Sequence, residues 1–71
     1  MSRSKTWTIV GYQKAKVQRA LEEAKVHAKV GGHLSERRDE IEVCVHSESE
    51  TTAETDVAFA KGFITGFLVS H

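Results

Sequence analysis

The chain has 71 residues, with ten basic and ten acidic side chains and a single cysteine, Cys44. A chain of this length forms one domain, residues 1–71, and buries only about 60% of the surface that its unfolded form exposes. One cysteine excludes an intrachain disulfide, and the polar start of the chain shows no signal peptide. We therefore expect a cytoplasmic protein that gains stability from a partner subunit.

Charge is divided unevenly between the two halves of the sequence. Residues 1–33 carry seven bases and two acids, a net charge of +5, whereas residues 34–71 carry three bases and eight acids, a net charge of −5. This division is typical of a dipolar fold whose halves attract each other within or between subunits. A nucleic-acid binder with an acidic rear surface has the same pattern.

The first half of the chain predicts a strand followed by a helix. Residues 1–5 are polar and expected to be frayed, and residues 6–12 are rich in β-branched and aromatic side chains, which favours a strand. Residues 13–30 predict an amphipathic helix with one small apolar face, formed by Val17, Ala20, Leu21, Ala24 and Ala28. Gly31 and Gly32 are predicted to end this helix. Alternatively, Val26, Ala28 and Val30 alternate as part of a strand, with the two glycines as a turn.

The second half predicts a loop, a strand and a helix. Residues 33–39 are mostly polar, and residues 40–46 alternate, with Ile41, Val43 and Val45 on one side. The predicted order is β-α-β-α, an α/β or α+β domain, and a crossover helix between two strands of one sheet predicts that they are parallel. Since two strands make a poor sheet with open edges, we expect the sheet to be extended in a homodimer or higher homo-oligomer.

The final predicted helix, residues 57–70, is apolar on almost every side. At about 100° per residue its side chains form three stripes. The core stripe is Val57, Ala60, Ile64 and Leu68, the Phe stripe is Phe59, Phe63 and Phe67, and the small stripe is Ala58, Gly62, Gly66 and Ser70. A helix with this pattern is typically buried on more than one side, so we expect it to pack on the first helix and on the sheet.

The small stripe predicts close helix packing. Internal glycines cost about 1 kcal/mol each relative to Ala, and close approach of another backbone is a physical reason to have them. Ala20, Ala24 and Ala28 of the first helix form a matching face, so we predict that the two small faces meet. A membrane span is the alternative, but the apolar run of residues 57–69 contains Lys61 and is shorter than the roughly 20 residues that a span needs. We expect no membrane contact.

Side chains that carry chemistry are sparse and scattered. Cys44 and His46 share one side of a predicted strand, and with a third ligand they would suit zinc, but the spacing matches no standard site. A Cys44 nucleophile would need an oriented base and an oxyanion site, and neither is evident. Gly31 and Gly32 follow a helix instead of opening one, which matches no phosphate-binding motif. We expect no enzyme, no metal ion and no cofactor.

The sequence favours a small homo-oligomeric protein that acts by binding a protein, or a small ligand held between subunits. Regulatory accessory proteins of phages and plasmids have this size. The expected interface residues are Trp7, Phe59, Gly62, Phe63, Gly66 and Phe67. The alternative function is nucleic-acid binding by the basic half of the chain. Its expected contacts are Arg3, Lys5, Lys14, Lys16, Arg19, Lys25 and Lys29.

Overall fold

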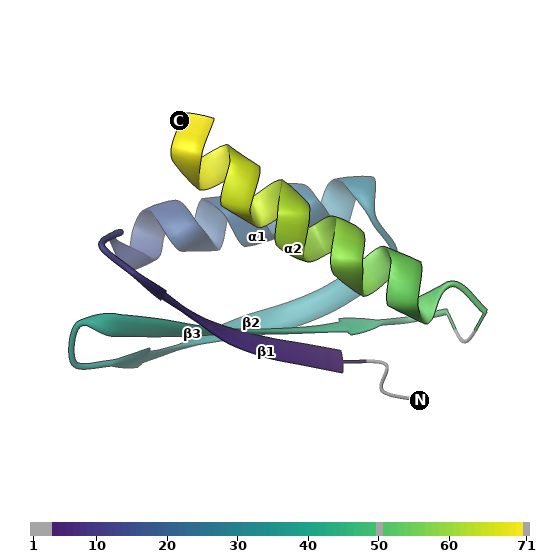
Figure 1. The fold of residues 1–71 in the computed structure, drawn as a ribbon, viewed down its shortest axis with the longest axis horizontal. Coiled ribbons are helices and arrows are strands. Elements are labelled where there is room, and N and C mark those ends of the chain that lie inside the picture. The colour runs from purple at the N-terminus through teal and green to yellow at the C-terminus, as the bar shows by residue number, and fades with distance from the viewer. Residues whose placement is uncertain (1–3, 50, 71) are drawn as a thin grey trace.

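The computed structural model describes residues 4–49 and 51–70. The elements in chain order are β1 (Ser4–Val10), α1 (Lys14–His27), β2 (Val30–Arg37), β3 (Glu40–Ser47) and α2 (Ala53–Ser70). The domain is α+β: a three-stranded antiparallel sheet has both helices on one side (Figure 1). The predicted order of elements lacked one strand, β2.

The strand order is β1-β3-β2, so the last strand in sequence is the central one. It pairs antiparallel with both neighbours, which makes β1 and β2 parallel to each other with β3 between them. This is a split β-α-β unit. The predicted parallel pair, residues 6–12 with residues 40–46, is therefore wrong, because the crossover helix α1 connects β1 to β2. A two-stranded sheet is also wrong, and extension of the sheet by a second chain stays a prediction.

Strand β2 occupies a segment for which the sequence predicted the end of a helix (residues 13–30) and a polar loop (residues 33–39). Helix α1 ends at His27, and Gly31 and Gly32 lie inside β2 instead of stopping a helix. A Cβ added at Gly32 would lie 2.6 Å from the Cys44 carbonyl oxygen and 3.2 Å from Leu21 Cδ1. Glycine at this position thus permits α1 and β3 to approach β2 closely, a tertiary requirement that periodicity does not reveal.

The core lies between the sheet and the helices. It is built from aliphatic side chains of four elements. The predicted inward face of β3 is confirmed, and that of α1 is confirmed except for Ala28, which follows the helix and is only partly buried. The buried set is Val17, Ala20, Leu21, Ala24, Val30, Ile41, Val43, Val45, Val57, Ala60, Ile64 and Leu68. The core stripe of α2 is therefore confirmed as buried. The opposite side of the sheet, called the open face below, carries the alternate residues of each strand.

The connection from β3 to α2 is held by the one buried polar side chain among the described residues, Ser47. Its Oγ lies 3.2 Å from Asp56 Oδ2 and 3.1 Å from the Ser49 carbonyl oxygen, and it accepts the Ser49 N–H at 3.1 Å. Thr52 Oγ1 also donates to Asp56 Oδ2, at 2.8 Å. Glu54 and Asp56 in the first turn place negative charge at the positive end of the helix dipole.

Candidate protein-protein interface

The outer face of α2, opposite the core stripe, is exposed and uncharged. Val69 is 75% exposed and Phe59 is 49% exposed. Between Val57 and Ser70 the only charged residue is Lys61, and its Nζ lies 5.8 Å from the ring centroid of Trp7, on the side of α2 that faces β1. An exposed helix face normally carries charged side chains. A face without them is a candidate contact surface.

The small stripe lies on this outer face. Gly62 and Gly66 are exposed, and a Cβ added at either would meet no atom of the described residues within 4 Å apart from its chain neighbours and the adjacent backbone of α2. The predicted packing of Ala20 and Ala24 against these glycines is therefore wrong. Helix α2 turns its aliphatic core stripe inward instead, because burying each Val, Leu or Ile stabilises the fold by about 1.5–3 kcal/mol and a glycine contributes no side chain.

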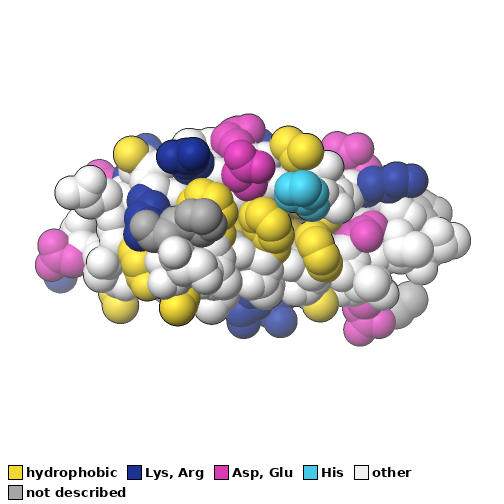
Figure 2. Space-filling model, turned by 90° about the horizontal axis from the view of Figure 1, so that it is seen from above, with side chains coloured by type: hydrophobic (Ala, Val, Ile, Leu, Met, Phe, Trp, Pro, Cys, Tyr) yellow, Lys and Arg dark blue, Asp and Glu magenta, His cyan; other side chains and the backbone are white. Residues whose placement is uncertain are grey.

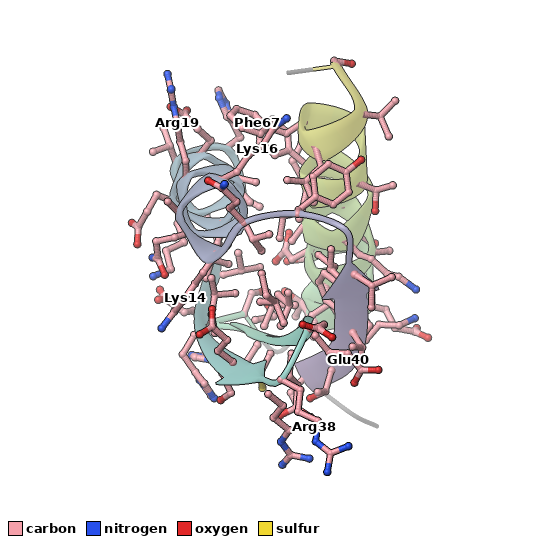
Figure 3. The ribbon with its side chains drawn as sticks, turned by 90° about the vertical axis from the view of Figure 1, so that its left-hand side faces the viewer. Lys14, Lys16, Arg19, Arg38, Glu40 and Phe67 are labelled. Carbon is pink, nitrogen blue, oxygen red and sulfur yellow. The ribbon has the colours of Figure 1, made fainter. Side chains whose placement is uncertain are left out.

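The Phe stripe follows the seam between the two helices. Ring centroids are 6.1 Å apart for Phe59 and Phe63 and 6.3 Å apart for Phe63 and Phe67, and the His27 ring of α1 lies 5.3 Å from Phe63. Figure 3 shows Phe67 where the two helices adjoin. Phe63 and Phe67 pack partly against the core. The helix side of the molecule consequently presents a band of hydrophobic side chains along its middle (Figure 2).

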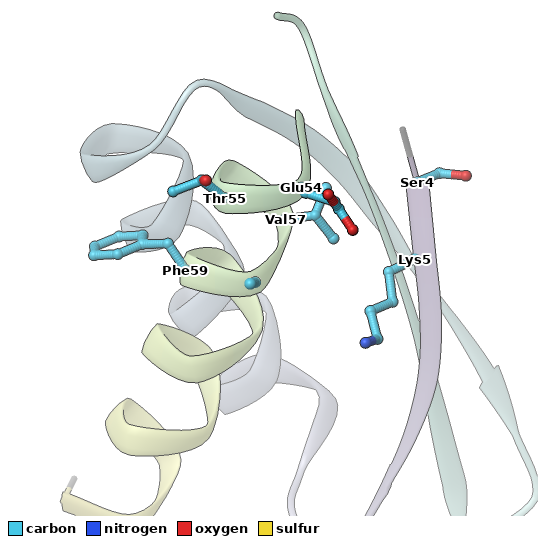
Figure 4. Close-up of a pocket in the computed structure, with 7 residues that line it drawn as sticks. Ser4, Lys5, Glu54, Thr55, Val57 and Phe59 are labelled. Atoms are coloured by element: carbon cyan, nitrogen blue, oxygen red, sulfur yellow. The ribbon is translucent and has the colours of Figure 1, made fainter. Parts of the chain in front are cut away.

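A groove separates the start of β1 from the first turns of α2 (Figure 4). It has a volume of about 870 Å³ and is lined by Ser4, Lys5, Glu54, Thr55, Val57, Ala58 and Phe59. Further along β1, Trp7 and Ile9 face the helices but are only partly buried. Of the predicted interface residues, Trp7 therefore lies under α2 beside Lys61, and the other five belong to α2 itself.

The basic residues of the N-terminal half do not form one surface in the part of the chain that is described. Figure 3 shows Lys14 on the sheet side of α1, with Lys16 and Arg19 on the opposite side. Lys25 lies 3.5 Å from Glu22, and Lys16 Nζ lies 5.4 Å from the ring centroid of Tyr12. Arg3 is outside the described residues. The described residues thus show no continuous basic patch that combines these side chains, and nucleic-acid binding stays a prediction.

Cys44 and His46 lie on the open face. Cys44 is flanked in register by Thr6 and His33. The His46 ring lies over Gly31, where an added Cβ would be 2.7 Å from Nε2. Across residues 4–49 and 51–70, no group of three or more His, Cys, Asp or Glu side chains is placed to hold a metal ion.

No protein-family model, curated protein or solved structure matches the chain. None of the helices in the described residues has the length and apolar character that a membrane span requires. The exposed surfaces are therefore the remaining indication of function, and the uncharged outer face of α2 is the most distinctive of them.

Proposed function

We propose that the chain is a small non-enzymatic binding protein that self-associates through the outer face of α2 and acts by protein contacts. The observation that carries this proposal is the absence of charge on an exposed helix face between Val57 and Ser70, apart from the sheet-directed Lys61. Interface cores are depleted in charged residues and enriched in aromatic ones. The outer face of α2 and the adjoining Phe stripe have this composition.

The exposed glycines strengthen the proposal. Gly62 and Gly66 make no close contact with the rest of the described chain, so each lowers helix stability by about 1 kcal/mol relative to Ala without improving the packing of the monomer. Close approach by another backbone supplies the missing physical reason. The half-buried rings of the Phe stripe then offer a second apolar surface, along the seam between α1 and α2, to a protein partner.

A charge introduced on the outer face tests this proposal. Gly62→Glu replaces an exposed helix glycine by a good helix former, so the monomer should keep its fold while the contact surface gains a charge that must be desolvated. Ala15→Glu, at an exposed position of α1, is the matched control. Light scattering should show the wild type and Ala15→Glu as oligomers and Gly62→Glu as a monomer. Equal masses for all three proteins would refute the proposal.

A further inference from the structure

The geometry points to a specific partner for the free edge of β1: the β1 strand of a second copy, so that two sheets join into one of six strands. This inference rests on the self-association proposed above. Within the described residues β1 pairs only with β3, which leaves its other edge without a partner strand. A strand edge with open backbone groups is a template for another strand. The partial burial of Trp7 and Ile9 shows that the helix-facing side of β1 is incompletely covered.

The midpoints of β1 and α2 lie close together, which is the arrangement that a two-fold axis relating two copies of the chain would require. Trp7 is the central residue of the seven-residue strand, and Lys61 and Gly62 are the central residues of the 18-residue helix. Lys61 Nζ lies 5.8 Å from the Trp7 ring centroid, so the midpoints of the two elements adjoin. One axis near Trp7 would therefore pair β1 with its copy and α2 with its copy, both antiparallel and along their full lengths.

The helix layer explains why this contact needs small side chains. Three strands at about 4.8 Å spacing are about 14 Å wide, whereas two helices need about 16–20 Å. When two such sheets join edge to edge, the axes of the two α2 helices must therefore lie near the short end of the usual separation of about 8–10 Å. The flank of α2 on the β1 side carries Ala58, Gly62, Thr65 and Val69, with Glu54 at the start of the helix and Lys61 below them toward Trp7. Small residues on this flank let the two α2 backbones come close.

The other sheet edge lacks these properties. The flank of α1 that lies opposite its contact with α2 carries Lys14, Gln18, Glu22 and Lys25, and Figure 3 shows Lys14 on that outer side. Gln18 donates to Glu22 at 2.7 Å, and Lys25 lies 3.5 Å from the same carboxylate. A second α1 placed there would bury several charges at once, which is unfavourable unless each is paired. The β1 edge also carries charged side chains, namely Lys5, Glu54 and Lys61, but Ala58, Gly62 and Thr65 lie among them, so a second copy fits the β1 edge better than the β2 edge.

The available area sets the expected strength of the contact. Helix α2 is about 27 Å long, and the layer formed by a helix and the strand beneath it is about 15 Å thick. The side of this layer that faces the second copy therefore has a projected area of roughly 400 Å². The accessible area that is buried exceeds the projection because it follows the relief of the side chains. The projected area is about half of the roughly 800 Å² per partner that a standard interface buries, so we expect a contact near the low end of specific interfaces, whose dimer dissociates on dilution.

Matched lysine pairs on the two sheet edges test the assignment. Thr6 and Thr8 of β1 lie beside Cys44 and Glu42 on the open face, and His33 and Ser35 of β2 lie beside the same two residues. Lysines on an exposed edge oppose strand addition without disrupting the sheet, and with an axis at Trp7 they would face each other across the new strand pair.

We expect Thr6→Lys with Thr8→Lys to raise the dimer dissociation constant by at least about tenfold, and His33→Lys with Ser35→Lys to change it less than about twofold. The β1 amides of the wild type should also gain protection from hydrogen exchange with rising concentration. A wild-type dimer that tolerates the β1 lysines and shows no such protection would overturn the β1 contact and leave self-association standing. A wild type that stays monomeric up to about 1 mM would overturn both.

Discussion

Gly32 gives the sharpest test of how β2 is held in the fold. Alanine at this position would bring a Cβ to 2.6 Å from the Cys44 carbonyl oxygen, 3.1 Å from Val45 Cγ1 and 3.2 Å from Leu21 Cδ1. The first of these atoms is backbone in the central strand and cannot swing aside. Overpacking of this kind costs typically about 1–3 kcal/mol. We therefore expect Gly32→Ala to lower the midpoint of thermal unfolding by roughly 4–24 °C, since 1 kcal/mol corresponds to about 4–8 °C in a domain of this size.

Gly31→Ala is the matched control for this prediction. The three heavy atoms nearest to a Cβ at Gly31 would all belong to the His46 ring, with Nε2 at 2.7 Å, and an exposed side chain moves aside more readily than backbone does. Its unfolding midpoint should stay close to that of the wild type when both are followed by circular dichroism. Unfolding midpoints of Gly32→Ala and the wild type that agree within about 2 °C would show that Leu21 and the β3 backbone do not pack closely against Gly32.

Three further predictions concern a turn, a helix start and the basic half of the chain. Arg38 in the β2–β3 turn has φ +52°, so Arg38→Gly should stabilise the fold by up to about 1 kcal/mol in chemical denaturation; a loss of stability would contradict strain there. Ser47→Ala removes the buried hydroxyl beside Asp56 and should cost about 1 kcal/mol, whereas an unchanged midpoint would mean that the hydroxyl does not anchor α2. If the basic residues bind nucleic acid, a mobility shift at low salt should weaken steeply with added salt and in Lys16→Ala with Arg19→Ala; no shift at low salt would dispose of that alternative.

The parts of the fold that follow from side-chain periodicity were predicted from the sequence. Alternation at Ile41, Val43 and Val45 identified the inward side of β3, and the aliphatic spacing of α2 identified its core stripe, because one buried face imposes a regular pattern on each element. Strand β2 was missed because two of its residues are glycines. The presence of Gly32 is explained by the positions of Leu21 and the β3 backbone, which no local pattern contains.

The candidate interface was predicted only in part. Phe59, Gly62 and Gly66 were selected from the sequence, and the structure places all three on the exposed side of α2, but it was expected that the glycines would contact α1. Periodicity shows which residues of a helix share a side, whereas the choice of the buried side depends on what the sheet and α1 offer. The free edge of β1 was also hidden, since strand order follows from pairing between distant segments.

Self-association through the outer face of α2 is the central claim, and the absolute mass of the wild type over a concentration series tests it most directly. Light scattering from about 10 µM to about 1 mM should show the mass rising from that of one chain to that of two, as expected for an interface of modest area. A mass that stays at that of one chain over the whole range would contradict the claim, and the exposed glycines of α2 would then need another explanation.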